Sequence, residues 1–474
     1  MMEQRRNVMI IRRLYKKDRS FYGKVFTLAI PIALQSLLTI GVNMLDTIMV
    51  GSLGETALSA VSLANSFISI YQIFCMGLGM GASVLVSRYW GMKLSETSKS
   101  AAETALKQTV CLMLRLTLFL ASLFAAAMLI IPGTLMRMYT DDPGIIRAGI
   151  TYFDYSVATC FFLGLSLTTT IALRSVGQVR LPLFVSFGAF FVNLFSNYVL
   201  IFGKLGLPRM GVAGAALGTL FARIFETLLI LGYLFLRDER ICFRPADLLI
   251  KTGSLLREYI RISIPVLISD GILALGNNSV AMVIGHLGAV FVAANAITSV
   301  TQQLSTVVIQ GVSQAGAIVT GQTLGTGKRE AAMDQGWLFL GLGLALGTLS
   351  AVFITLISGP MVGAYLNVSA DTRKTAIELM EAISIIIVFQ ATNSIMTKGV
   401  LRGGGDTRML MLADNVFLWV LSLPLGLLAG FVLHLSAFWI YIFLKSDQIV
   451  KTVWCVWRLQ SGKWIKRIST GNNS

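Results

Sequence analysis

Residues 30–60, IPIALQSLLTIGVNMLDTIMVGSLGETALSA, form a long apolar stretch that is interrupted by the carboxylate of Asp46. Shifted by 234 positions, this stretch lies without a gap over residues 264–294, IPVLISDGILALGNNSVAMVIGHLGAVFVAA. The residues identical in both copies include Pro31, Asn43, Gly51, Leu53, Gly54 and Ala60. Such self-similarity predicts that one structural unit occurs twice in the chain.

A second pair of matching segments supports the duplication. LRSVGQVR, which begins at Leu173, matches LRGGGDTR, which begins at Leu401, at nearly the same offset. Each half is predicted to hold six helices, and an even number gives both halves the same orientation. The halves are therefore predicted to be parallel repeats, an arrangement found in transporters whose two lobes expose a central site alternately.

The composition predicts an integral membrane protein, since 55% of the 474 residues are hydrophobic and only 13% are charged. A membrane-spanning helix needs about 20 apolar residues, and the runs here are too long and continuous for barrel strands. We therefore expect an all-α fold with twelve transmembrane helices. The runs cover residues 25–50, 59–86, 109–131, 152–173, 181–203, 211–235, 262–285, 294–320, 335–358, 379–400, 410–430 and 436–457.

Basic residues predict the topology, because cytoplasmic loops carry an excess of Lys and Arg. They are dense before residue 25, in the central linker and after residue 457, so both termini are predicted to be cytoplasmic. The predicted parts are an N-terminal tail, an N-lobe of six helices, a linker, a C-lobe of six helices and a C-terminal tail. They cover residues 1–24, 25–235, 236–261, 262–457 and 458–474. The first run has no cleavage pattern after it, so we expect a retained span in the plasma membrane.

Several classes of protein are excluded by the same sequence. The net charge of +16 is spread along one predicted membrane face and is not concentrated in one domain, which favours contact with anionic lipid over nucleic acid. The five cysteines lack paired spacing, and no HExxH or phosphate-loop motif is present. We expect no enzyme activity, no cofactor, no obligate protein partner and a monomer. Without a nucleotide site, transport must draw on an ion gradient.

Polar residues inside the predicted spans mark candidate sites, because a carboxylate at mid-helix costs about 2.5 to 3.5 kcal/mol on insertion scales. Gln35, Thr39, Asn43 and Asp46 form one stripe at helical spacing. Gln303 and Gln310 belong to a similar stripe in the eighth span, and Asp270 lies near the end of the seventh. These residues either line a substrate cavity or form interhelical hydrogen bonds that hold the bundle together.

Other charged residues have simpler interpretations. Arg223 and Glu226 are three positions apart in the sixth span and are expected to pair with each other. Asp270, Lys398 and Asp414 lie near span ends, where contact with solvent is the default.

Several motifs together resemble the multidrug and toxic compound extrusion (MATE) family. They are DTIMVGSLG, GMGASVLVSRYWG, LRSVGQVR, NLFSNYVLIFG, GVAGAALGTLFAR and LRGGGDTR, and they occur in this order from Lys24 to about Arg467. The resemblance implies two six-helix lobes around a V-shaped cavity. It also implies antiport, in which varied and often cationic organic compounds leave in exchange for H⁺ or Na⁺.

The resemblance also implies a cation-coupling site at Asp46, with Asn193, Asn197 and Thr219 around it and Na⁺ as the one candidate metal. One family branch has an aspartate at the position of Asn197. Another has acidic residues in the seventh and tenth spans, where this chain has Leu273 and Ala391. A second-lobe ion site therefore lacks the carboxylates that this branch would supply.

Two other functions fit a duplicated helical membrane protein. A flippase for lipids or lipid-linked oligosaccharides would need cationic side chains in its cavity, and the spans contain few unpaired ones. A sensor or structural protein would show no vectorial flux. Antiport of small organic molecules is the function that the sequence favours.

Overall fold

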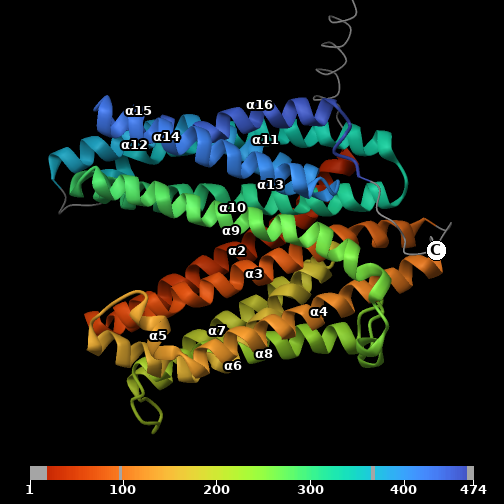
Figure 1. The fold of residues 1–474 in the computed structure, drawn as a ribbon, viewed down its shortest axis with the longest axis horizontal. Helices are drawn as coiled ribbons and strands as arrows, with labels where there is room; N and C mark the ends of the chain where they lie inside the picture. The colour runs from red at the N-terminus through yellow and green to blue at the C-terminus, as the bar shows by residue number, and fades with distance from the viewer. Residues whose placement is uncertain (1–18, 96–98, 364–368, 467–474) are drawn as a thin grey trace, which may run out of the picture. The chain divides into compact units, whose positions relative to one another are not determined.

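The computed structural model describes residues 19–95, 99–363 and 369–466. Within these residues the chain forms helices and turns (Figure 1). The long helices of the first half are α2 (Arg19–Gly51), α3 (Glu55–Leu94), α4 (Lys99–Ile130), α6 (Pro143–Ser175), α7 (Arg180–Phe202) and α8 (Val212–Leu236). The short helix α5 (Pro132–Arg137) lies between α4 and α6, and the short helix η2 (Pro245–Leu249) follows α8. The all-α fold predicted from the apolar runs is confirmed.

The second half contains α9 (Gly253–His286), α10 (Ala289–Gly325), α11 (Arg329–Gly363) and α12 (Ala370–Ser394). After α12 come η3 (Ile395–Leu401), α13 (Thr407–Val416), η4 (Phe417–Ser422), α14 (Leu423–Leu427), η5 (Leu428–Val432), α15 (Ala437–Leu444) and α16 (Ser446–Gln460). The stretches η3, η4 and η5 are π-helical and continue their neighbouring helices.

Eleven of the helices in the described residues are long and apolar enough to cross a membrane. The twelfth predicted span, residues 436–457, is not one continuous helix but is divided at Lys445 into α15 and α16. The predicted span at residues 436–457 is therefore helical but consists of two consecutive helices. Ser422 explains part of the break, because its hydroxyl accepts a hydrogen bond from the Asp447 amide at 2.6 Å and so satisfies the start of α16.

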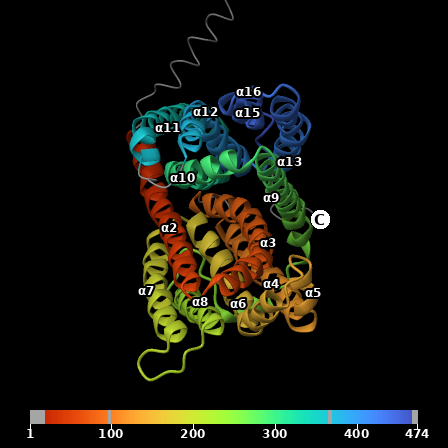
Figure 2. The same cartoon turned by 90° about the vertical axis from the view of Figure 1, so that its left-hand side faces the viewer.

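The chain divides into two compact units. Among the described residues, unit 1 comprises 19–33 and 268–466, and unit 2 comprises 34–267. In Figures 1 and 2, unit 1 is a bundle that includes α10, α11, α12 and α16, and unit 2 is a bundle that includes α3, α4, α6, α7 and α8. The boundaries after residues 33 and 267 are 234 positions apart, the same offset that relates the two sequence copies.

The backbone repeats the sequence duplication at its glycines. Gly54 and Gly288, which precede α3 and α10, have φ angles of 111° and 106°. Gly177 and Gly405, in the second pair of matching segments, have φ angles of 83° and 84°. Residues that carry a side chain rarely adopt these φ angles, so glycine is needed at both members of each pair.

The first helix of each half takes part in both units. The segment of α9 up to Leu267 packs in unit 2 against Gly77 of α3, where an added Cβ would come 2.9 Å from the Leu267 Cβ. The segment of α2 up to Ala33 packs in unit 1 against Gly311 of α10, where an added Cβ would come 3.0 Å from the Ala33 Cβ. Both contacts obey the offset of 234, so the repeat extends to helix packing.

The last helices of the two halves also match. The Thr227 hydroxyl of α8 donates to the Phe162 carbonyl at 2.7 Å, and the Thr452 hydroxyl of α16 donates to the Phe389 carbonyl at 3.1 Å. This equivalence of Thr227 and Thr452 relates α8 to α15 and α16, and we call it the threonine register. In this register Glu226 corresponds to Lys451.

Candidate functional site

Two helices of unit 2, α2 and α7, bring three of the four predicted coupling residues together. Asp46 lies on α2, and Asn193 and Asn197 lie one turn apart on α7. Asn197 Nδ2 donates to Asp46 Oδ1 at 2.6 Å and is 3.3 Å from Asn193 Oδ1. We call Asp46, Asn193 and Asn197 the Asp46 cluster. Asn197 is 1% exposed and Asn193 is 5% exposed, so the carboxylate contacts an amide that is almost fully buried, and that amide contacts a second one.

Helix α8 approaches the Asp46 cluster closely at Gly218. A Cβ added at Gly218 would overlap Asn197 Oδ1, so only a residue without a side chain fits there. Asn197 Oδ1 is itself buried and has no hydrogen-bond partner among the described residues. A buried amide oxygen of this kind can accept a hydrogen bond or contact a cation.

Charged and hydroxyl groups surround the Asp46 cluster. The Asp46 carboxylate interacts electrostatically with Arg223 of α8 and with Tyr152 of α6. The Tyr152 hydroxyl donates to Asn65 Oδ1 at 3.2 Å and also interacts with Thr219, the remaining predicted coupling residue. Within the described residues, no group of three His, Cys, Asp or Glu side chains could hold a metal ion.

A second polar network lies three helical turns along α2 and α7 from the Asp46 cluster. Gln35 Nε2 donates to the Ser186 hydroxyl at 2.6 Å, and the Ser186 hydroxyl is 3.4 Å from Glu226 Oε1. Arg223 Nη1 lies 2.6 Å from Glu226 Oε2, which confirms the predicted pairing of these two residues. Gln35 Oε1 accepts from Arg174. We call Gln35, Ser186, Arg223 and Glu226 the Glu226 network.

The other predicted cavity residues have different surroundings. Thr39 and Asn43 are exposed on α2, and the Thr39 hydroxyl donates to the Gln35 carbonyl at 3.0 Å. Gln303 and Gln310 are exposed on α10. Asp270 is paired with Arg402, whose Nη2 lies 3.2 Å from Asp270 Oδ1. Asp270 therefore has a protein partner in unit 1.

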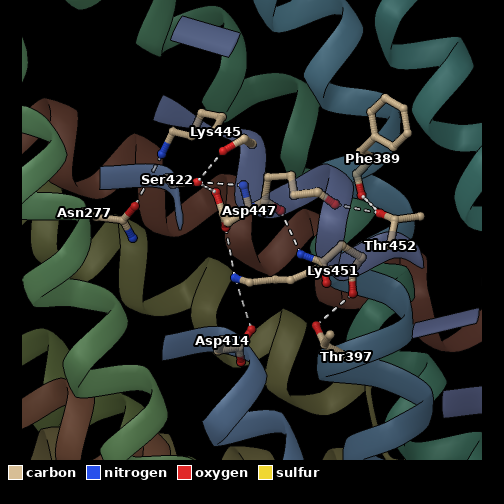
Figure 3. Close-up of polar contacts among 12 residues, drawn as sticks. Asn277, Phe389, Thr397, Asp414, Ser422, Lys445, Asp447, Lys451 and Thr452 are labelled. Carbon is tan, nitrogen blue, oxygen red and sulfur yellow. Dashed lines mark hydrogen bonds and ion pairs between the residues drawn. The ribbon is translucent and has the colours of Figure 1, made fainter. Parts of the chain in front are cut away.

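One charged group was not expected from the sequence. Asp414, Asp447 and Lys451 meet inside unit 1, and we call them the Lys451 triad (Figure 3). The interpretation of Asp414 as a solvated residue at a span end is wrong, because it is 4% exposed and pairs with Lys451. The spacing of Asp447 and Lys451, one helical turn apart, was the available signal.

The fold and the polar clusters define a class of protein: an α-helical membrane protein with two repeated units, each of which holds a cluster of charged and polar side chains between its helices. Family comparison makes this assignment specific. The MatE family model matches residues 31–199 and 265–428, and the chain belongs to this family. It is a transporter and not an enzyme.

Relatives extend over nearly the whole chain. Multidrug resistance protein NorM of Burkholderia vietnamiensis is 29% identical over 437 residues, which cover 91% of this chain and 92% of the relative. The uncharacterized transporter YisQ of Bacillus subtilis (strain 168) is 24% identical over 454 residues, which cover 95% of this chain and 96% of the relative.

Solved structures have the same fold. A MATE protein in complex with MaL6 has a TM-score of 0.82 at 19% identity, with 93% of this chain and 96% of that chain covered. An outward-facing multidrug resistance MATE family transporter of the MOP superfamily has a TM-score of 0.81 at 20% identity, with the same coverage.

Proposed function

We propose that this protein exports organic compounds across the plasma membrane in exchange for H⁺ or Na⁺, with Asp46 as the coupling carboxylate. The family membership and the multidrug resistance relative support export of varied small molecules, cationic ones among them. The single observation that carries the coupling assignment is the contact between Asp46 and the buried Asn197 amide. Both termini are proposed to face the cytoplasm, on the basis of the Lys and Arg distribution.

The Asp46 cluster has the chemistry that a coupling site needs. A carboxylate can take up a proton, and the Asp46, Asn193 and Asn197 side-chain oxygens are ligands that a hard cation such as Na⁺ prefers. Asn197 holds the charged carboxylate through a charge-assisted hydrogen bond. Neutralising the carboxylate weakens this bond, so loading of the ion changes how α2 contacts α7.

Exchange requires that the ion and the organic substrate favour different conformations. A ligand that binds two conformations equally shifts no equilibrium between them. We propose that an ion at Asp46 favours an arrangement of α2 and α7 with low affinity for the outgoing substrate. Release of the ion then restores the substrate-binding arrangement, which couples the two fluxes.

Reconstituted vesicles provide the test. We expect Asp46→Asn to abolish ethidium transport driven by an imposed H⁺ or Na⁺ gradient, because an amide takes up neither ion as a carboxylate does. Applying the two gradients separately identifies the ion. Asp371→Asn, at an exposed residue in the first turn of α12, is the matched control and should transport as the unmodified protein does.

A further measurement separates loss of coupling from loss of folding. Ethidium equilibrium exchange without any ion gradient should persist in Asp46→Asn, because that process needs only the substrate site and the conformational change. Normal gradient-driven export by Asp46→Asn would refute the assignment of Asp46 as the coupling residue.

A further inference from the structure

The Lys451 triad places one ammonium between two carboxylates inside unit 1. Lys451 Nζ lies 3.3 Å from Asp414 Oδ1 and 3.0 Å from Asp447 Oδ2 (Figure 3). Asp414 is 4% exposed, and the other two residues are 2% exposed. Three charges this deeply buried are tolerated only when each has partners.

Every carboxylate oxygen of the triad has a donor. Asp414 Oδ1 faces Lys451, and Asp414 Oδ2 accepts from the Ser269 hydroxyl at 3.1 Å. Asp447 Oδ1 accepts from the Ser422 hydroxyl at 3.1 Å, and Asp447 Oδ2 accepts from Lys451 and from Gln448 Nε2. All four oxygens are thus engaged, whereas the Asp46 cluster has a buried amide oxygen without a partner among the described residues.

The charges around the triad also balance. Lys445, at the break between α15 and α16, interacts electrostatically with Asp447 and Lys451, and its Nζ is 3.4 Å from Asn277 Oδ1 (Figure 3). Two lysines therefore accompany two aspartates. Cys455 and Tyr441 also interact with these groups, and a thiol and a phenol are ordinarily neutral at pH 7.

The repeat relates the triad to the Glu226 network of unit 2. In the threonine register Lys451 takes the place of Glu226. In the register that aligns LRSVGQVR with LRGGGDTR, Asp414 takes the place of Ser186. The same hydrogen-bonded level thus exists in both units, with the signs of the charges changed. At this level each unit has a cation that is covalently part of the protein, Arg223 in unit 2 and Lys451 in unit 1.

We infer that the Lys451 ammonium is a tethered counter-ion that occupies the position between Asp414 and Asp447 where a free cation would otherwise bind, so that unit 1 takes up no coupling ion. The transport cycle then exchanges a single cation, at Asp46. A tethered ammonium cannot diffuse away, and its local concentration excludes competing cations from the two aspartates. This inference rests on the proposed function of Asp46.

The decisive experiment measures how cations affect the unfolding temperature of the purified full-length protein in detergent. In the Asp46→Asn variant, we expect the unfolding temperature to be independent of the Na⁺ concentration. We also expect that mildly acidic buffer does not raise it through protonation of Asp414 or Asp447. Adding Lys451→Gln leaves Asp414 and Asp447 without their ammonium. The double variant should gain a Na⁺-dependent or H⁺-dependent rise on the order of 2 °C or more. Lys398→Gln in the same background, at an exposed lysine of η3, should produce no such dependence.

The outcomes distinguish this inference from the proposed function. If Asp46→Asn alone keeps a cation dependence that Asp414→Asn removes, unit 1 binds an exchangeable ion and the tethered counter-ion is refuted. If Asp46→Asn keeps a dependence that Asp414→Asn does not alter, a further exchangeable site lies outside the triad, and the single-cation cycle is refuted. A double variant that folds but gains no dependence also refutes the inference.

A second variant covers the case in which Lys451→Gln does not fold. Asp414→Asn keeps Lys451 paired with Asp447 and should leave the cation concentration for half-maximal export unchanged, with a Hill coefficient of about one. A shift of about tenfold or more in that cation concentration would overturn the inference. A Hill coefficient that falls in Asp414→Asn would also overturn it, because it would reveal a second cooperative site in unit 1.

Discussion

The two units have polar side chains at one matching position along their helices, which we call a level, but they differ at a second level. The Glu226 network of unit 2 has the Lys451 triad as its counterpart in unit 1, and both are closed sets of paired groups. The Asp46 cluster has no polar counterpart at its aspartate, because Val280 occupies the position of Asp46 and is 5% exposed. The level kept in both units is shared by the scaffold, and the level present in one unit is the one for which we propose ion coupling.

The same difference extends to the residues around Asp46. In the register that aligns LRSVGQVR with LRGGGDTR, unit 1 has Leu421 and Leu425 at the positions of Asn193 and Asn197. In the threonine register, Thr219 is likewise replaced by a leucine, Leu444. Apolar side chains build that part of unit 1 without a charge. The amides of the Asp46 cluster are therefore not required for helix packing, which strengthens their assignment to ion binding.

The largest effect should come from filling the space at Gly218, whose matched residue in unit 1 is Phe443. In Gly218→Ala the new Cβ would displace Asn197, at a cost of about 1–3 kcal/mol for overpacking. We expect gradient-driven export to fall about tenfold or more. Gly232→Ala in the same helix is the control, since a Cβ there meets no atom within 4 Å. Equal export by the two variants would show that the position of Asn197 does not matter for coupling.

A smaller effect is expected at a pair of matching arginines. The arginine in unit 1 has a carboxylate partner, and the arginine in unit 2 has an amide partner. Arg402 pairs with Asp270 at 3.2 Å, whereas Arg174, its match in the repeat, bonds to Gln35. Asp270→Gln would make the two pairs alike and should lower the free energy of unfolding by about 1 kcal/mol, the charge-assisted part of the bond. Urea unfolding in detergent measures this change. An unchanged cation dependence of export is the accompanying expectation, and a shift there would place Asp270 in the coupling machinery.

The smallest effect on stability is expected at Thr39, which Leu273 matches in the second copy. Within the described residues its exposed hydroxyl bonds to the carbonyl of Gln35 in the same helix, so Thr39→Val should change the free energy of unfolding by less than about 0.5 kcal/mol. If Thr39 lines the substrate cavity as proposed, the apparent KM for ethidium should rise about twofold to tenfold, the value of one lost hydrogen bond. An unaltered KM would remove Thr39 from the cavity.

The sequence predicted the repeat because the features that define it are local. Identical prolines and glycines at one offset require the same backbone in both copies, as the φ angles of Gly54 and Gly288 show. Apolar runs likewise located eleven long helices, since length and hydropathy decide whether a helix can span a membrane. The break at Lys445 was missed because it depends on side chains from another helix, including Ser422.

Contacts between distant residues were less accessible. Asp46 and Asn197 are 151 positions apart, and helical periodicity places each on a face without saying which faces meet. Only the resemblance to a known family predicted that these two residues belong to one site. The Lys451 triad had no such guide, and a lysine or aspartate near a predicted span end is expected to reach solvent, which concealed the pairing of Asp414.

The passage of α2 and α9 between units has a consequence for biosynthesis. When the ribosome has completed α8, unit 2 still lacks residues 253–267, and the first residues of unit 1, 19–33, must wait for a partner that begins at residue 268. Neither unit can reach its final packing as an isolated translation product of one half-gene. Assembly should thus be concerted and late, with residues 19–33 in need of protection within the membrane until α10 emerges.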